Sequence, residues 1–90
     1  MIVFFSKTFE KSFDSLKDNN VKKRLQQVID KLEIANSLAD ISNVISIKNY
    51  SNLYRIRIGK YRLLLSHERN SIEILLLDCL KRNENTYKFI

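Results

Sequence analysis

Three arginines, Arg55, Arg57 and Arg62, are the residues of this chain most able to do chemistry, and they lie on both sides of its only glycine, Gly59. In the two runs that flank this glycine, basic residues are interleaved with apolar ones. A guanidinium group binds a phosphate through two parallel hydrogen bonds, and it stays protonated at every physiological pH. Three such groups within a short stretch indicate a site for an anionic ligand, provided that the fold brings them to one surface.

The dipeptide Gly59–Lys60 predicts a β-hairpin with strands at about 53–58 and 61–67. Glycine at the first central position of a two-residue loop is typical of a type II′ turn. That turn fixes a register in which Arg57 lies directly opposite Arg62, and the alternation of side chains then puts Arg55 on the same face. Opposed like charges destabilise a strand pair by a few tenths to about 1 kcal/mol. A bound polyanion is a reason for such an arrangement, which we call the arginine face (Arg55, Arg57 and Arg62).

The positive charge of the chain is concentrated in the half that contains the hairpin. The net charge is +6, and residues 46–90 contribute +5 of it. A basic surface indicates an anionic partner, either a nucleic acid or an acidic protein. No apolar run approaches the roughly 20 residues that a membrane-spanning helix needs, and the N-terminal segment lacks the basic start of a signal peptide. We therefore expect a cytoplasmic protein that does not bind membranes.

The rest of the pattern predicts the elements that position this hairpin. Residues 2–5 are β-branched and aromatic, which indicates a short, buried strand. Apolar residues at helical spacing predict helices over about 8–17 and 21–36, and the segment 18–20 offers an N-cap for the second helix. Residues 37–52 are loop-like, with a short extended piece near 44–47. The apolar run over 72–80 predicts a strand at the centre of the sheet.

Together these elements predict a single α+β domain over residues 1–90. An N-terminal strand and an αα-hairpin are expected to pack on one face of a mostly antiparallel, twisted sheet, in the order β-α-α-β-β-β. The helices would cover the apolar face and leave the arginine face open. Cys79, the only cysteine, excludes a disulfide within the chain and a cysteine-based zinc site, and its apolar strand predicts a buried, inert thiol. The sequence contains no recognisable metal cluster or cofactor motif, so neither a metal nor a cofactor is expected.

This pattern resembles the RelE/ParE superfamily of bacterial toxins from toxin–antitoxin pairs over nearly the whole chain. The most specific part is Tyr-Arg-Ile-Arg-Ile-Gly-Lys-Tyr-Arg at 54–62, preceded by Ile47-Lys48 and followed by a tail with basic residues and then a tyrosine. The resemblance implies a RelE-like microbial ribonuclease fold and a cognate antitoxin protein as partner. Members that resemble RelE are ribosome-dependent endoribonucleases that cut mRNA in the A site and arrest translation. Members that resemble ParE inhibit DNA gyrase, so the fold alone does not separate the two activities.

The resemblance also implies which residues form the site. RNA cleavage by attack of a 2′-OH needs a general base, cations that stabilise the phosphorane and an acid that protonates the leaving oxygen. The catalytic candidates carried over to this chain are Arg62, Lys81, Arg82 and Tyr87. The RNA-binding candidates are Arg55, Arg57, Lys48 and Lys60.

Which residue acts as the general base stays open. Arg57 is a poor base, because a pKa above about 12 leaves less than about one neutral side chain in 10⁵ at pH 7. The family carries lysine where the hairpin of this chain carries arginine. Lys81 is the more tunable of the two basic tail residues, and Tyr87 is interpreted as a proton donor, a stacking platform or a C-terminal anchor. His67 alternates with residues on the opposite face and is interpreted as a loop or edge residue.

A ParE-like inhibitor of DNA gyrase without nuclease activity is the alternative function. The hairpin strands carry arginine at the positions where the family has lysine, which leaves the base unidentified and favours this alternative. A toxin without activity and an unrelated small nucleic-acid binder are further alternatives.

Overall fold

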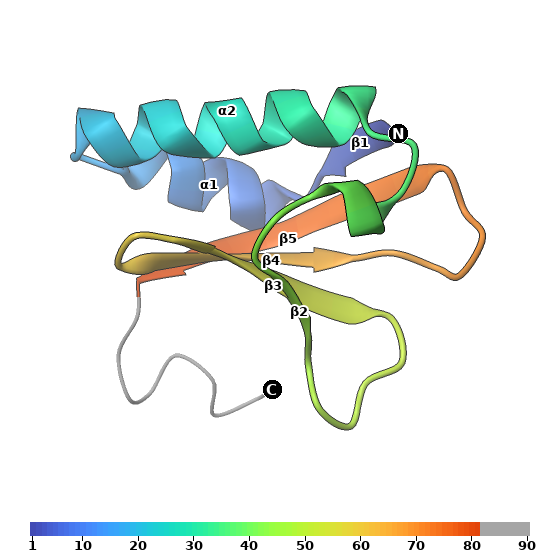
Figure 1. Cartoon of the computed structure of the whole chain (residues 1–90). Helices are drawn as coiled ribbons and strands as arrows, with labels where there is room; N and C mark the ends of the chain where they lie inside the picture. The colour runs from blue at the N-terminus through green and yellow to red at the C-terminus, as the bar shows by residue number, and fades with distance from the viewer. Residues whose placement is uncertain (82–90) are drawn as a thin grey trace.

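The structure, a computed structural model, describes residues 1–81. Both helices lie on one face of the sheet (Figure 1), which confirms the predicted α+β class. The helices and strands begin and end within two residues of their predicted bounds. In chain order they are β1 (Ile2–Phe5), α1 (Lys7–Ser15), α2 (Asn19–Ile34), the 3-10 helix η1 (Leu38–Asp40), β2 (Val44–Ser46), β3 (Leu53–Ile58), β4 (Tyr61–Ser66) and β5 (Glu73–Lys81).

The sheet has five strands in the order β1-β5-β4-β3-β2. β1 is parallel to β5, and every other pair is antiparallel. The extended piece expected near residues 44–47 is β2, which pairs with β3 and adds an edge to the sheet. β5 is an interior strand as predicted, although the middle position belongs to β4. The register of β4 and β5 shifts between Leu64 and Leu65, since Leu64 lies opposite Asp78 whereas Leu65 lies opposite Leu76.

The prediction that residues 2–5 form a buried strand is wrong in its burial. Ile2, Phe4 and Phe5 are 48%, 47% and 44% exposed. β1 lies at the edge of the sheet and pairs only with β5, so one side of the strand has no neighbouring strand to cover it. Apolar composition indicates a strand, but it does not reveal whether the strand is interior or at an edge.

Side-chain caps fix where the helices begin. The Asp18 carboxylate accepts hydrogen bonds from the main-chain N–H groups of Asn20 and Val21, at 2.9 and 3.3 Å, which confirms the predicted N-cap. The Ser6 hydroxyl accepts one from the N–H of Phe9 at 2.9 Å and caps α1 in the same way. Such a cap stabilises a helix by about 1 kcal/mol. The two caps therefore determine the residue at which each helix begins.

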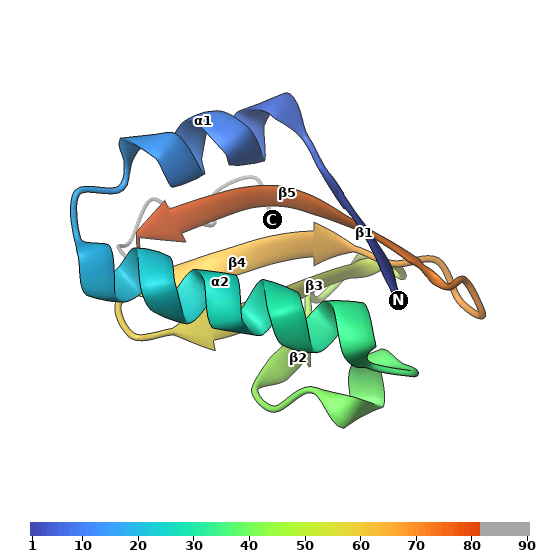
Figure 2. The same ribbon diagram turned by 90° about the horizontal axis from the view of Figure 1, so that it is seen from above.

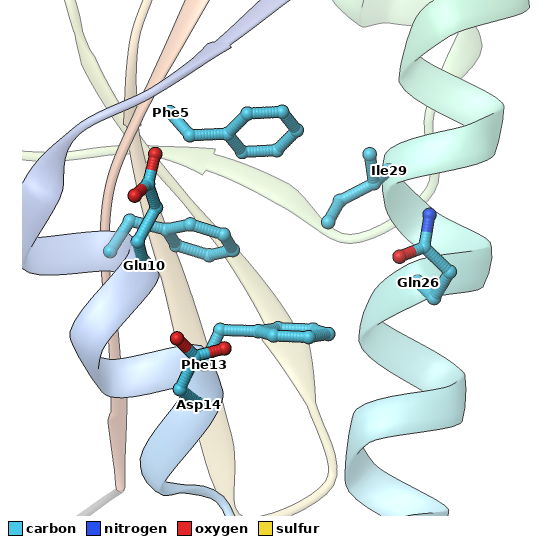
Figure 3. A pocket seen from close by; sticks show the side chains of 7 residues that line it. Phe5, Glu10, Phe13, Asp14, Gln26 and Ile29 are labelled. Atoms are coloured by element: carbon cyan, nitrogen blue, oxygen red, sulfur yellow. The ribbon is translucent and has the colours of Figure 1, made fainter.

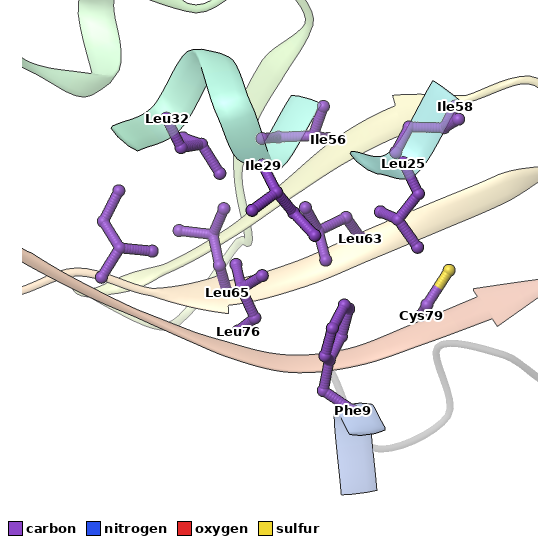
Figure 4. Packing of buried hydrophobic residues seen from close by; sticks show 11 residues of the cluster. Phe9, Leu25, Ile29, Leu32, Ile56, Ile58, Leu63, Leu65, Leu76 and Cys79 are labelled. Carbon is purple, nitrogen blue, oxygen red and sulfur yellow. The ribbon is translucent and has the colours of Figure 1, made fainter. Parts of the chain in front are cut away.

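The core fills the space between the helices and the sheet (Figure 4). α2 contributes Leu25, Ile29 and Leu32, which point toward the apolar side chains of β3, β4 and β5 (Figure 4). Leu25 and Leu32 have no exposed surface. Within residues 1–81, neither helix is long and apolar enough to cross a membrane. Because this core covers one face of the hairpin, the arginine face lies on the other side of the sheet. The sheet members of the core are Ile56, Ile58, Leu63, Leu65, Ile74, Leu76 and Cys79.

Candidate nucleic-acid interface

The turn that joins β3 and β4 has the geometry that the sequence predicts. Gly59 adopts a φ of +58°, which an L-residue rarely adopts, and Lys60 is not among the residues with positive φ. This combination fits a type II′ turn and excludes type I′, in which both central residues have positive φ. Ile58 lies opposite Tyr61, so the loop has the two residues predicted.

The register brings the three arginines together on one face. Arg57 lies directly opposite Arg62, and Arg55 lies opposite Leu64. On the other side of β3, Arg55 lies opposite Ile45 of β2, which is 49% exposed. The arginine face therefore combines positive charge with apolar side chains, and such a surface can hold phosphates beside ribose or base surfaces.

The three arginines differ in exposure, and the expectation of a fully open arginine face is wrong at Arg62. Arg57 is exposed and Arg55 is half-buried, whereas Arg62 is only 7% exposed. Arg62 is on β4, the middle strand, whereas Arg55 and Arg57 are on β3, next to the edge. A side chain on a central strand has neighbouring strands on both sides, so its stem is covered from two directions.

Hydrogen bonds hold the Arg62 guanidinium at the tip of the hairpin. Its Nη1 donates to the carbonyl oxygen of Tyr61 at 3.1 Å and, more weakly, to that of Gly59 at 3.4 Å. A guanidinium that is fixed and poorly hydrated exerts a stronger field on a nearby phosphate than a solvated one does. Arg62 is thus placed as a fixed positive charge beside the exposed Arg57.

Lys81 does not join the arginine face. It lies opposite Tyr61, which in turn lies opposite Ile58, a residue buried against the helices. Directly opposed residues share a face, so the register assigns Lys81 to the helix-covered side at the end of β5. Arg62, by contrast, lies opposite Leu80.

The other predicted site residues are dispersed or lie outside the described part. Lys60 is exposed in the turn, and Lys48 is exposed in the connection between β2 and β3. Arg82 and Tyr87 lie outside the described residues. Two of the four catalytic candidates are thus placed by the structure, and they lie on opposite faces of the sheet.

His67 has a structural partner, in agreement with its interpretation as a loop residue. Its Nε2 donates to the carbonyl oxygen of Ser71 at 2.8 Å, since a carbonyl can only accept. Its main-chain N–H donates to the carbonyl of Asn52, and its ring lies 6.4 Å from that of Tyr54. These contacts fix the connection between β4 and β5.

Cys79 is buried, as predicted from its apolar strand. Burial raises the pKa of its thiol from 9.0 to about 11, with a smaller contribution from the neighbouring Asp78 carboxylate. Such a thiol is almost entirely protonated at neutral pH and is therefore a poor nucleophile. Within residues 1–81 no group of three or more histidine, cysteine or acidic side chains could hold a metal ion.

An apolar pocket between the two helices lies on the helix side of the sheet, away from the arginine face. It encloses about 340 Å³. The rings of Phe5 and Phe13 project into it toward Ile29 of α2, and Glu10 and Asp14 lie at its rim (Figure 3). Its acidic rim does not complement a polyanion, so it is not part of the candidate interface.

A second pocket contains basic residues that the sequence reasoning missed. It lies between α2 and β3 and is lined by Arg24 and Lys31 together with Arg57. The apolar stripe of α2 predicts which side of the helix faces the core, and the basic residues on the remaining surface carry no predicted role. The available signal was the spacing of Arg24, Gln27 and Lys31 at i, i+3 and i+7, which places them on one side of the helix.

Comparison with known proteins identifies the family. The family model described as "ParE toxin of type II toxin-antitoxin system, parDE" matches residues 3–86. Toxin RelE3 of Methanocaldococcus jannaschii is 39% identical over 64 residues, which are 70% of this chain and 72% of that protein.

Solved structures agree with this match. The crystal structure of the RelB–RelE antitoxin–toxin complex from Methanococcus jannaschii contains a chain that is 30% identical, with a TM-score of 0.78 over 97% of this chain and 98% of that chain. A chain of the archaeal RelE–RelB complex from Pyrococcus horikoshii OT3 is 26% identical, with a TM-score of 0.73 over 92% and 96% of the two chains. The chain therefore belongs to the RelE/ParE superfamily of toxins from type II toxin–antitoxin systems.

Proposed function

We propose that this toxin is a ribosome-dependent endoribonuclease that cleaves mRNA in the A site and so arrests translation. The observation that carries the proposal is the pairing of Arg57 with Arg62, with Arg55 on the same face of the hairpin. The similarity to a toxin named RelE3 supports the RelE-like activity. The reaction needs no metal, because cations of the protein neutralise the phosphate.

The differences in exposure suggest different tasks for the three arginines. Arg57 is exposed and contacts the scissile phosphate, whereas Arg62 supplies a fixed positive charge from the neighbouring strand. Arg55, with Ile45 and Leu64 beside it, holds the neighbouring nucleotide. The phosphorane carries more negative charge than the ground-state phosphodiester, so this field lowers the barrier of the 2′-OH attack.

The proton transfers require groups other than these arginines. Protonated guanidinium groups cannot accept the 2′ proton at neutral pH. The candidates from the sequence are Lys81, Arg82 and Tyr87. A lysine gives up its proton more readily than an arginine does, and Tyr87 can donate a proton or stack on a base. The register assigns Lys81 to the helix-covered side of the sheet, opposite Tyr61. In this proposal Lys81 would reach the substrate from the end of β5, next to the hairpin turn.

A cognate antitoxin protein is the proposed partner in the resting cell. Two of the similar structures are complexes of RelE with RelB. Acidic side chains of such a partner would cover the arginine face, because opposed like charges are relieved by a complementary surface. The mRNA on the ribosome then competes with the antitoxin for the same cations.

Inhibition of DNA gyrase is the second candidate function. The family model that matches this chain is described as a ParE toxin, and the chain has arginines where RelE-like enzymes carry lysines. Under this alternative the arginine face is a binding surface for a protein and no RNA is cut.

Induction of the protein in growing cells, followed by primer extension on a reporter mRNA, separates the two functions. We expect cuts at defined positions within translated codons. The cuts should disappear with Arg57→Ala and persist with Arg69→Ala, a matched control that removes an exposed arginine from the connection between β4 and β5. Intact mRNA together with inhibited supercoiling by purified gyrase would support the alternative.

A further inference from the structure

We infer that the groove between α2 and β3 is a second phosphate subsite, which continues the RNA path from the arginine face around the edge of the sheet. The groove encloses about 350 Å³. Its cationic members are Arg24, Lys31 and Arg57, and Ile56 and Ile58 form part of its floor. The inference rests on the proposed ribonuclease function and extends it to residues outside the hairpin.

The groove exists because β2 is shorter than β3. β2 pairs with Tyr54 to Ile56 only, so it does not reach Arg57. α2 runs above the sheet and over β3 (Figure 2). The uncovered end of β3 therefore opens into the space under α2, and Arg57 belongs both to the arginine face and to the groove.

Cations outnumber carboxylates in the groove, so its lining carries a net positive charge. Within residues 1–81, the carboxylate among the lining side chains is that of Asp40, and its Oδ2 accepts hydrogen bonds from the N–H groups of Asn36 and Ser37, at 3.0 and 3.3 Å. That carboxylate thus serves the cap of η1. Three cations in one concavity raise the local potential and attract an anion.

The side chain of Arg24 lies close to the hairpin turn. A Cβ built on Gly59 would lie 2.9 Å from Nη1 of Arg24, so the guanidinium lies against the bare backbone of the turn. Lys31 follows Arg24 two turns later on the same side of α2. The two cations mark a line along the helix that begins at the hairpin tip, next to Arg57 and Arg62.

A phosphodiester chain fits this surface better than an isolated anion. Arg55 and Arg57 share one face of β3, and Arg57 also lines the groove with Arg24 and Lys31, so the cations connect the arginine face to the groove. The apolar floor and the polar side chains of Gln27 and Asn43 offer contacts for ribose and its 2′-OH. Proteins that bind single strands combine such a charged groove with apolar contact surfaces.

The test measures the affinity of the purified protein for a 2′-O-methylated RNA oligonucleotide of about ten nucleotides, which cannot be cleaved. The double variant Arg24→Gln/Lys31→Gln is compared with Lys11→Gln/Lys23→Gln, which removes the same charge from exposed helix positions outside the groove. Equal urea midpoints of the two variants establish that both are folded. We expect the groove variant to bind about tenfold more weakly and to reduce the salt slope by about 1.4, since each lost phosphate contact on a single strand contributes about 0.7. The control should change affinity by less than about threefold.

Equal weakening by both double variants would overturn the inference, because net charge alone would then explain binding. An acidic peptide that loses affinity for the groove variant, while the RNA does not, would also overturn it and assign the groove to a protein partner. The proposed function fails on a different result. If the parent protein cuts no mRNA on ribosomes, the ribonuclease function is refuted. If instead the groove variant binds RNA as well as the parent does, the subsite is refuted and cleavage by the parent is unaffected.

Discussion

Arg57 and Arg62 lie directly opposite each other on β3 and β4, yet Arg57 is exposed to solvent and Arg62 is only 7% exposed. Side chains in this relation have Cβ atoms about 5 Å apart. The pair places one guanidinium where a ligand can reach it and a second, buried one beside it. A protein that binds no anion at this point would gain stability from replacing the exposed Arg57.

Replacing Arg57 with glutamine should stabilise the free protein. The expected gain in the free energy of unfolding is a few tenths to about 1 kcal/mol at low salt, because the repulsion from Arg62 is removed. The gain should shrink in about 1 M salt, where the Debye length is about 3 Å. Urea denaturation at both salt concentrations measures it. Arg69→Gln serves as the control, and a less stable Arg57→Gln protein at low salt would contradict the repulsion.

Gly59→Ala should destabilise the hairpin by about 1–2 kcal/mol. The positive φ of +58° is strained for an L-residue, and the new Cβ would approach Nη1 of Arg24. The Arg24 side chain is flexible, so most of the loss should remain when the same substitution is made in an Arg24→Ala background. A double-mutant cycle by urea denaturation separates the two contributions. A loss that vanishes in the Arg24→Ala background would show that the contact, and not the backbone, dominates.

Cys79 should make stability fall between pH 9 and pH 11. The pKa of the thiol is about 11 in the folded protein against 9.0 as its ordinary value, so the unfolded chain loses its proton first as the pH rises. The unfolded state therefore becomes more favourable across this interval, by on the order of 2 kcal/mol. The stability that the protonated thiol contributes is complete below pH 9. The measurement is the difference between the unfolding free energies of the parent and Cys79→Ala as a function of pH, and a flat difference would refute the raised pKa.

His67 should affect stability and leave cleavage unchanged. His67→Ala removes the hydrogen bond to the Ser71 carbonyl and is expected to cost about 1 kcal/mol. The partners of His67 are Ser71 in the connection between β4 and β5, Asn52, and Tyr54 of β3, so we expect a structural role for this residue. Denaturation and mRNA cleavage are measured side by side on the purified variant. A folded His67→Ala protein without cleavage activity would contradict this structural role and indicate a part in catalysis.

The hairpin could be predicted from sequence to the level of single residue pairs. A lone glycine in the turn permits one loop length and one turn type, and that choice determines which residue faces which along both strands. The αα-hairpin followed from apolar spacing, and its second helix begins at the predicted Asp18 cap. These features depend on contacts between residues that are close in sequence.

Features that depend on the whole sheet could not be predicted in this way. The exposure of Phe4 and the burial of Arg62 both follow from the strand order, in which β1 is at the edge and β4 in the middle. The separation of Lys81 from Arg62 depends on the register of β5 against β4. The groove with Arg24 and Lys31 needs a short β2 next to a longer β3, and nothing local in the sequence determines that difference in length.

Cleavage of mRNA in a reconstituted ribosomal complex with an empty A site tests the central claim most directly. We expect the purified protein to cut the A-site codon and to leave the same mRNA uncut in the absence of ribosomes. The rate should fall at least about 10²-fold with Arg57→Ala but not with Arg69→Ala. An unchanged rate for a folded Arg57→Ala protein, or no cleavage by the parent on ribosomes, would contradict the claim that the arginine face is the catalytic surface of a ribonuclease.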